Sequence, residues 1–352
     1  MEHNETFTDF VKRKKQQFFQ VKNNLRIIFV SSLNKETGNN YKSIDQTTNE
    51  LLGLCKKYDI DYHYFSKENA FIEAVCKEEI SISPYTFIYN QSFSGPLFSR
   101  RILIPAFCGF NHLPYMGNDA YRMGLLCDKF HYYSILKNIG VPIADFWYYH
   151  YAFGWLTEKP VEGLKVIMKL SNENNKISLS RESVFPYSDD YEEAIHSLSL
   201  TYKQGVILQK FIIGYEITVP VIIDKNTSYI PNILGIRYGD EIRHGEQFFT
   251  EEIFSNVSHM NYENKYYDFD SVNSSLKKTI IDYSKKIVQA LGIRWFTRID
   301  LRVDDSWGIY FNDIGSMPSI MPTGAFACIY QMNNLSYEDF LITTICIDWQ
   351  KT

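Results

Sequence analysis

Two acidic residues near the C-terminal end of the chain could bind a metal ion. Asp300 and Asp313 lie in two runs of strand-forming residues, and Arg298 stands two positions before Asp300. Because alternate residues of a strand face the same side, Arg298 and Asp300 share one face. The turn-forming residues 304–308 predict a hairpin between the two runs, which brings both carboxylates together.

Two converging carboxylates repel one another unless a cation lies between them. Oxygen ligands suit a hard cation such as Mg²⁺, which usually accompanies nucleotide phosphates. The hairpin therefore predicts a metal–nucleotide site. The alternative interpretation is that Asp300 and Asp313 are ordinary surface carboxylates of a hairpin.

The composition excludes several classes of protein. The chain has 352 residues, of which 45% are apolar and 22% charged, which is typical of a soluble protein with two or three domains. A net charge of −5 argues against a broad surface for nucleic acid. No apolar run approaches the roughly 20 residues that cross a bilayer, and no signal peptide is evident. Six scattered cysteines without a CxxC pair indicate a reducing compartment. We therefore expect a cytoplasmic protein without nucleic-acid or membrane partners.

Hydrophobic patterns predict the elements that position the hairpin. A polar segment at 1–24 predicts a helix packed on the outside. Three apolar runs separated by helical patterns then predict an open parallel sheet, and they cover 25–30, 60–65 and 85–89. A second unit follows, with strands at 166–170 and 206–211 on either side of a helix at 191–202. A third unit holds a strand at 216–223, a helix near 272–291 and the hairpin.

Taken in order, several segments resemble the ATP-grasp superfamily, and within it the D-alanine–D-alanine ligases, over roughly residues 25–345. The matching segments are Leu113-Pro-Tyr-Met-Gly117 with Cys127-Asp128-Lys129, Gly140-Val-Pro142, Val166-Ile-Met-Lys169, the run from Leu208 to Glu216, and Arg298-Ile-Asp300 through Asp313. The resemblance implies an α/β chain (α+β overall) with the three-domain ATP-grasp fold and a Rossmann-like N-terminal domain. The expected domains are 1–127 at the N-terminus, 128–209 as the central lid, and 210–352 with the metal site and a mobile loop.

The resemblance also implies which residues bind ATP. Lys129 and Lys169 would neutralise the phosphates as flexible point charges. Gln209 stands where the family has a glutamate beside adenine, and its amide keeps an acceptor oxygen. Glu216 would accept hydrogen bonds from the ribose hydroxyls. The other implied cofactor-binding residues are Lys176 at the phosphates, the backbones of Lys210 and Ile212 at the adenine edge, and Asn312 beside the metal.

The implied metal ligands are Asp300 and Asp313, which would bind one or two Mg²⁺ ions, or Mn²⁺, between the β- and γ-phosphates. Arg298 would stabilise charge on the transferred phosphoryl group and on the later tetrahedral intermediate. Lys265 and Tyr266 resemble the family's mobile-loop residues that exclude water from the site. The residues expected at the amino-acid substrates are Glu36, Ser319 and Thr323.

The sequence departs from the family pattern mainly where the amino acids would bind. Gly315 stands where the family has a third metal ligand, an asparagine, and Ser319 replaces a glycine. The phosphate loop at 174–178 contains no glycine. The segment around Glu36 matches the family's substrate-gripping loop one residue out of register.

These departures predict an ATP-dependent carboxylate–amine ligase with substrates other than two D-alanines, such as a specialised dipeptide or amide ligase. The reaction would pass through an acyl phosphate and release ADP and phosphate. Two alternatives stay open, namely a nucleotide-binding regulator without ligase activity and a phosphotransferase of the same fold. The resemblance also suggests a homodimer formed through the N-terminal domain.

Overall fold

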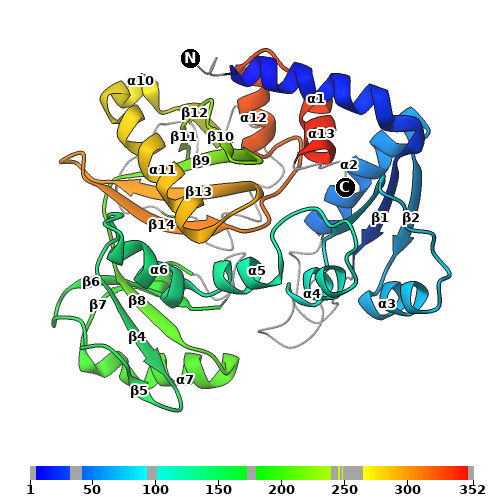
Figure 1. Cartoon of the computed structure of the whole chain (residues 1–352). Helices are drawn as coiled ribbons and strands as arrows, with labels where there is room; N and C mark the ends of the chain where they lie inside the picture. Colours follow the sequence, from blue (N-terminus) through cyan, green and yellow to red (C-terminus); the bar gives the residue numbers. More distant parts are fainter. Residues whose placement is uncertain are drawn as a thin grey trace.

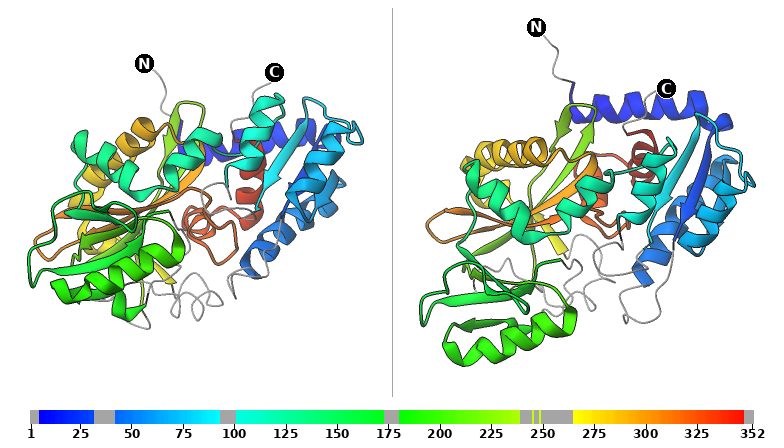
Figure 2. Two further views of the ribbon diagram at one scale, coloured as in Figure 1. Left: turned by 90° about the horizontal axis from the view of Figure 1, so that it is seen from below. Right: turned by 60° about the horizontal axis from the view of Figure 1, so that its bottom comes forward.

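Three β-sheets with attached helices make up the chain (Figure 1). The computed structural model describes residues 5–31, 42–92, 101–172, 180–238, 245, 248 and 265–347. Figure 2 shows from two further sides that the first and third sheets lie beside one another and that the second projects from the third. The predicted α/β fold class and the three-part organisation are confirmed.

A three-stranded parallel sheet of order β2-β1-β3 forms the N-terminal part. Its strands β1 (Arg26–Val30), β2 (Asp61–Phe65) and β3 (Thr86–Asn90) coincide with the three predicted apolar runs. The helices of this part are α2 (Lys42–Tyr58), α3 (Glu68–Cys76) and α4 (Leu103–Phe110). Parallel strands joined by helices give the Rossmann-like arrangement that the sequence predicted.

The second sheet is antiparallel, with the order β5-β4-β8-β6-β7. Its strands are β4 (Phe146–His150), β5 (Gly154–Trp155), β6 (Lys165–Leu170), β7 (Val184–Pro186) and β8 (Val206–Lys210), and α7 (Glu192–Tyr202) lies against it. Lys169 pairs with Ile207 and Gln209 with Ile167, so Lys169 and Gln209 are diagonal neighbours on one face. The predicted domain boundary after Gln209 falls inside β8, and the boundaries at 127/128 and 209/210 stay predictions.

The third sheet has the order β12-β11-β9-β13-β14, and β10 pairs with β9. Its strands are β9 (Tyr215–Asp224), β10 (Thr227–Tyr229), β11 (Leu234–Ile236), β12 (Tyr266–Asp268), β13 (Trp295–Val303) and β14 (Ile309–Gly315). The predicted hairpin is formed by β13 and β14. In its turn, Asp304 Oδ1 accepts hydrogen bonds from the backbone of Ser306 (2.9 Å) and Gly308 (2.7 Å). Further α-helices of the described residues are α5 (Ala120–Leu126), α6 (Lys129–Asn138), α10 (Asp270–Asn273), α11 (Lys277–Leu291), α12 (Ala325–Met332) and α13 (Tyr337–Cys346).

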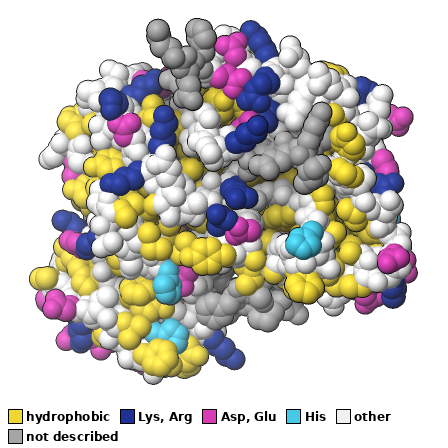
Figure 3. Space-filling model, in the orientation of Figure 1, with side chains coloured by type: hydrophobic (Ala, Val, Ile, Leu, Met, Phe, Trp, Pro, Cys, Tyr) yellow, Lys and Arg dark blue, Asp and Glu magenta, His cyan; other side chains and the backbone are white. Residues whose placement is uncertain are grey.

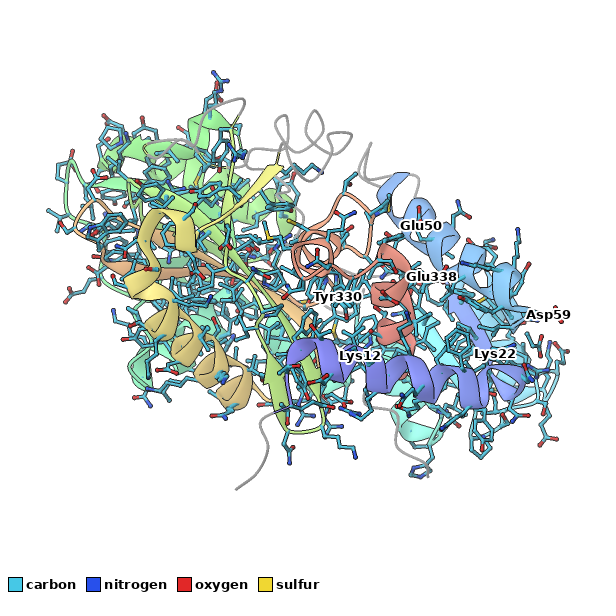
Figure 4. All side chains as sticks on the ribbon, turned by 90° about the horizontal axis from the view of Figure 1, so that it is seen from above. Lys12, Lys22, Glu50, Asp59, Tyr330 and Glu338 are labelled. Atoms are coloured by element: carbon cyan, nitrogen blue, oxygen red, sulfur yellow. The ribbon has the colours of Figure 1, made fainter. Side chains whose placement is uncertain are left out.

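Helix α1 (Phe7–Val21) packs on the outside of the molecule, as predicted, and joins the first and third sheets. Figure 4 shows it passing Tyr330 and Glu338 on its way towards α2. Phe10 is fully buried and stacks on Tyr229 of β10 with the ring centroids 4.1 Å apart, and the buried Phe18 packs on Tyr58 of α2. The sequence alone did not show which residues this face packs against.

One face of the molecule carries a mixture of side chains. On the face shown in Figure 3, lysine and arginine are interspersed with acidic and apolar side chains. Within the described residues, no helix is long and apolar enough to cross a membrane.

Candidate active site

A row of charged side chains crosses the third sheet. Arg298 and Asp300 are two residues apart on β13 and therefore share one face of the sheet. Thr218 of β9 pairs with Asp300. Arg298 donates two hydrogen bonds to Asp300, from Nε to Oδ1 (2.9 Å) and from Nη2 to Oδ2 (2.8 Å), and Thr218 Oγ1 donates to Oδ1 (2.8 Å). Burial lowers the pKa of Arg298, but Asp300 outweighs it and holds that pKa above its ordinary value. These three hydrogen bonds hold the Asp300 carboxylate in one orientation.

A β-bulge at Asn312 brings a second set of oxygens to the same place. Asp300 pairs with Asp313 and Leu301 with Phe311, which leaves Asn312 without an opposite residue. Adjacent strand residues normally face opposite sides, but a bulge redirects one of them. Lys169 Nζ donates to Asn312 Oδ1 (3.0 Å), while Lys129 Nζ lies 3.7 Å from Asp313 Oδ1. Asn312 therefore contacts Lys169, and Asp313 lies near Lys129.

Lys129 is the first residue of α6 and is 4% exposed. The preceding Asp128 caps this helix by accepting a hydrogen bond from the backbone of His131 (3.3 Å). Burial raises the pKa of Asp313, but Lys129, Lys169 and a hydrogen bond from Tyr132 lower it more, so its pKa lies below the ordinary value. Asp313 is therefore ionised and available to a cation.

Lys169 lies at the centre of a buried hydrogen-bond network. Its Nζ donates to Gln209 Oε1 (2.6 Å), Asn312 Oδ1 (3.0 Å) and the Tyr133 hydroxyl (3.1 Å). Burial lowers the pKa of Lys169 to about 7, although Asp313 opposes the shift. The side-chain nitrogen of Gln209, Nε2, is buried and finds no hydrogen-bond partner in the described part of the chain. An unpartnered buried donor is costly, which suggests that an acceptor from a ligand belongs there.

Glu216 is held at the other end of the row. It accepts hydrogen bonds from the Tyr238 hydroxyl and from Arg302 Nη1 (3.4 Å). Arg302 Nη2 also donates to the carbonyls of Gly214 (3.1 Å) and Gly245 (2.9 Å). Glu216 is thus fixed in direction before any ligand binds.

Lys265 and Thr323 are brought together, since Lys265 Nζ lies 3.4 Å from the backbone carbonyl of Thr323 and donates to it. Burial lowers the pKa of Lys265 to about 8. Burial also raises the pKa of Tyr266 to about 12, while the positive charge of Arg298 opposes that shift, so Tyr266 lies within electrostatic reach of Arg298. Ser319 is exposed, and its Oγ accepts from the Met321 backbone (3.3 Å).

The structure shows no hydrogen bond or ion pair between the remaining predicted residues and the row of charged side chains among the residues it describes. Glu36 and Lys176 lie outside the described residues. Lys210 has an exposed side chain, its backbone nitrogen donates to the Asp145 carbonyl (2.8 Å), and Ile212 is buried.

Sequence reasoning missed five residues that contact predicted site residues, namely Tyr132, Tyr133, Thr218, Tyr238 and Arg302. The period of two along a strand could have found Thr218 from Glu216 and Arg302 from Arg298. Nothing in the sequence pattern marked Tyr132 and Tyr133, because they belong to α6 and their hydroxyls contact residues of β14.

The residues present fit a magnesium–nucleotide complex. Within the described residues, no group of three or more His, Cys, Asp or Glu side chains could hold a metal alone. Mg²⁺ commonly takes only one or two carboxylates and completes its octahedron with phosphate oxygens and water. Asp300 and Asp313 supply two such carboxylates opposite one another, with two lysines beside them.

Comparison with known proteins places the chain beside one group of relatives. The family model described as D-ala D-ala ligase C-terminus matches residues 135–346. The chain is 25% identical over 243 residues to the D-alanine–D-alanine ligase of Carboxydothermus hydrogenoformans, covering 65% of this chain and 71% of that protein. It is 22% identical over 254 residues to the D-alanine–D-alanine ligase B of Clostridium perfringens, covering 68% and 73%.

The solved structures agree with this in fold. The crystal structure of a D-alanine–D-alanine ligase from Bacillus anthracis complexed with ATP superposes with a TM-score of 0.65. The superposition covers 91% of this chain and 96% of that one at 14% sequence identity. The ATP-grasp fold that the motifs predicted is therefore confirmed.

Proposed function

The chain belongs to the D-alanine–D-alanine ligase family, and from this premise we propose that it is an ATP-dependent ligase joining the carboxylate of one amino acid-like substrate to the amine of another. One observation carries the proposal. Asp300 and Asp313 face each other across a bulged hairpin, and Lys129 and Lys169 approach from α6 and β6. Paired carboxylates and lysines at one site suit a divalent cation with polyphosphate.

In this proposal ATP lies between the second and third sheets. Lys129, Lys169 and Asn312 would contact its phosphates, and Asp300 and Asp313 would hold Mg²⁺, or Mn²⁺, which would neutralise phosphate charge there. Gln209 and the backbones of Lys210 and Ile212 line the adenine edge. The ribose hydroxyls donate to Glu216, and Lys176 adds a further charge near the phosphates.

The reaction needs positioning and charge more than covalent help from side chains. A carboxylate oxygen of the first substrate takes the γ-phosphoryl group and ADP leaves. The amine of the second substrate then attacks the acyl carbon, and phosphate leaves with the C–O bond electrons. Arg298 stabilises the oxyanion, and Lys265 and Tyr266 exclude water from the acyl phosphate.

The substrates are proposed to differ from two D-alanines. Gly315 offers no side-chain ligand beside the metal, and the segment around Glu36 departs from the family pattern. Ser319 and Thr323 would line the second substrate's site. We expect the protein to act on small amino acid-like molecules in the cytoplasm as a homodimer.

The test is to incubate the protein with ATP, Mg²⁺ and pooled amino acids and to follow phosphate release and product masses. ADP together with a condensed product is expected. A phosphorylated product would indicate a phosphotransferase, and ATP binding without turnover would favour a regulator. Asp313→Asn should abolish magnesium-dependent turnover, whereas Asp305→Asn, an exposed acid in the turn of the same hairpin, should leave it intact.

A further inference from the structure

Two consecutive tyrosines of α6 contact the metal-binding hairpin. Helix α6 lies between β14 and the second sheet (Figure 1). Tyr132 and Tyr133 are fully buried, and their rings pack edge-on against Phe311 of β14. The Tyr132 hydroxyl donates to Asp313 Oδ1 (2.8 Å), and the Tyr133 hydroxyl donates to the backbone carbonyl of Asn312. Both hydroxyls thus reach the bulge.

Among the residues that the structure describes, the hydrogen bonds to the Asp313 carboxylate all go to one oxygen, Oδ1. Oδ1 accepts from Tyr132 and from the backbone of Ile314 (3.0 Å), and Lys129 Nζ lies 3.7 Å from the same oxygen. A carboxylate held at one oxygen by two donors cannot swing freely about its side-chain bonds. Its second oxygen, Oδ2, is therefore presented in one direction, as a monodentate metal ligand requires.

Tyr133 acts on the neighbouring residue. Its hydroxyl has one hydrogen, which goes to the Asn312 carbonyl, while its oxygen accepts from Lys169 Nζ (3.1 Å). The same lysine binds the Asn312 side chain (3.0 Å). Backbone and side chain of the bulge residue are thus tied to one point, which keeps Asn312 on the side of Asp313.

We propose that Tyr132 and Tyr133 are positioning residues of the metal–phosphate site, with Tyr132 orienting Asp313 towards the metal ion and Tyr133 fixing the Asn312 bulge. This inference rests on the proposed function. The competing explanation is that both tyrosines only fill the core. Replacement by phenylalanine separates the two explanations, because it keeps the ring packing and removes only the hydroxyl.

The experiment measures Mn²⁺ binding by electron paramagnetic resonance in the presence of a non-hydrolysable ATP analogue. Tyr132→Phe should weaken Mn²⁺ binding about tenfold, as loss of a partner that orients a metal ligand commonly does. Tyr133→Phe should weaken binding of the analogue about two- to tenfold, the range of one lost hydrogen bond. In turnover, Tyr132→Phe should raise the Mg²⁺ concentration for half-maximal rate and leave kcat at saturating Mg²⁺ near that of the parent.

A matched control is Tyr58→Phe, which removes a hydroxyl that donates to the Glu338 carboxylate (2.6 Å) away from the site. It should change neither affinity. If Tyr132→Phe binds Mn²⁺ as tightly as the parent, the positioning role of Tyr132 is wrong. The proposed function is not affected by that result, because the parent still binds Mn²⁺ with the analogue. A parent that binds no Mn²⁺ with the analogue overturns the proposed function itself. If Tyr132→Phe does not fold, the analogue affinity of Tyr133→Phe decides the inference.

Discussion

Lys169 illustrates how burial among neutral groups sets the pKa of a side chain. Its amine is buried among the amide oxygens of Gln209 and Asn312 and the Tyr133 hydroxyl, which are neutral. Without a carboxylate in direct contact, the cost of burying the charge dominates and the pKa falls to about 7. A phosphate placed beside Lys169 would restore the missing negative charge.

Nucleotide affinity should therefore fall as the pH rises above about 7. Free Lys169 loses its proton there, whereas a bound phosphate favours the protonated form and raises its pKa. Between the pKa of Lys169 in the free protein and its higher pKa in the complex, the complex holds more protons than the free protein. The nucleotide affinity therefore falls by up to about tenfold per pH unit in this range. Below this range Lys169 is protonated in both states and does not make the affinity depend on pH. Calorimetric titration with an ATP analogue at several pH values measures this slope.

Gln209→Glu is the informative comparison, because it places a carboxylate beside Lys169 and raises that pKa. The fall in nucleotide affinity should therefore begin at a higher pH in this variant. Protonation of the nucleotide itself affects both proteins equally and drops out of the comparison. Identical pH profiles for parent and variant would show that another group titrates.

Gly315 can be tested by introducing asparagine, the residue that the resemblance implies at this position. A Cβ atom at this position would lie 3.4 Å from Arg298 Cβ and 3.6 Å from the Arg298 carbonyl, which are ordinary contacts. Gly315→Asn should therefore fold and add an oxygen near Asp313. We expect the Mg²⁺ concentration for half-maximal turnover to fall about two- to tenfold, in the range of one added polar interaction. An unchanged or higher Mg²⁺ requirement would mean that the site does not use a ligand there, and Gly315→Ala controls for the backbone effect.

At the scale of elements, α1 and α6 each fix two other elements in relation to one another. Helix α6 joins β14 to β6 through its tyrosines, as described above. Helix α1 inserts Lys14 between β9 and α13, where its Nζ donates to Asp224 Oδ1 (2.7 Å) and to the Cys346 carbonyl (2.7 Å). Lys14 is 2% exposed, so α1 is tied to the third sheet by a buried ion pair.

Lys14→Ala should lower the free energy of unfolding by about 3 kcal/mol, because removal of one partner leaves a buried carboxylate poorly compensated. Arg13, whose Nη2 lies 3.2 Å from Asp224 Oδ2, limits the loss. Lys12→Ala is the control on the same helix, since the Lys12 side chain is 67% exposed, and it should stay within about 0.5 kcal/mol of the parent. Urea denaturation gives both values, and equal losses for the two variants would contradict the role of the pair.

At the scale of the whole molecule, the site exists only where separate sheets meet. Lys169 and Gln209 come from the second sheet and Asp300, Asp313 and Glu216 from the third. The N-terminal part also reaches the site's edge, where Arg101 Nη1 lies 3.4 Å from Ser316 Oγ. A ligand in this site would hold the sheets together.

Magnesium with an ATP analogue at about 100 times its Kd should therefore stabilise the protein by about 2.7 kcal/mol, as mass action requires. Lys129→Ala should lose most of that stabilisation at the same ligand concentration, because a charge beside the phosphates is removed. Lys159→Ala is the control, since Lys159 is an exposed lysine beside the second sheet that pairs with Asp189. This variant should retain the full stabilisation by the ligand. Thermal unfolding with and without ligand measures both, and an undiminished shift in the Lys129 variant would contradict the phosphate assignment.

Much of the fold could be predicted because its signals are local. Apolar runs marked β1, β2 and β3, and the Asp304 turn marked the hairpin, since side-chain period and turn chemistry are read from neighbouring residues. The ordered motifs also placed Lys129, Lys169 and Asp313 in one site before any contact was known. The residues that α1 packs against were not predicted, because Tyr229 and Tyr58 are distant from it in sequence.

The sequence by itself thus determined the first sheet, the strands β6, β8 and β9, the hairpin, and the identity of the charged residues along it. Only the tertiary structure decided which way Asn312 faces, because a bulge depends on how two strands pair and not on either strand alone. It also decided that Lys169 is buried beside neutral partners, and that Tyr132 and Tyr133 contact the hairpin. Those features depend on groups that are far apart along the chain and become neighbours only when the sheets and α6 pack together.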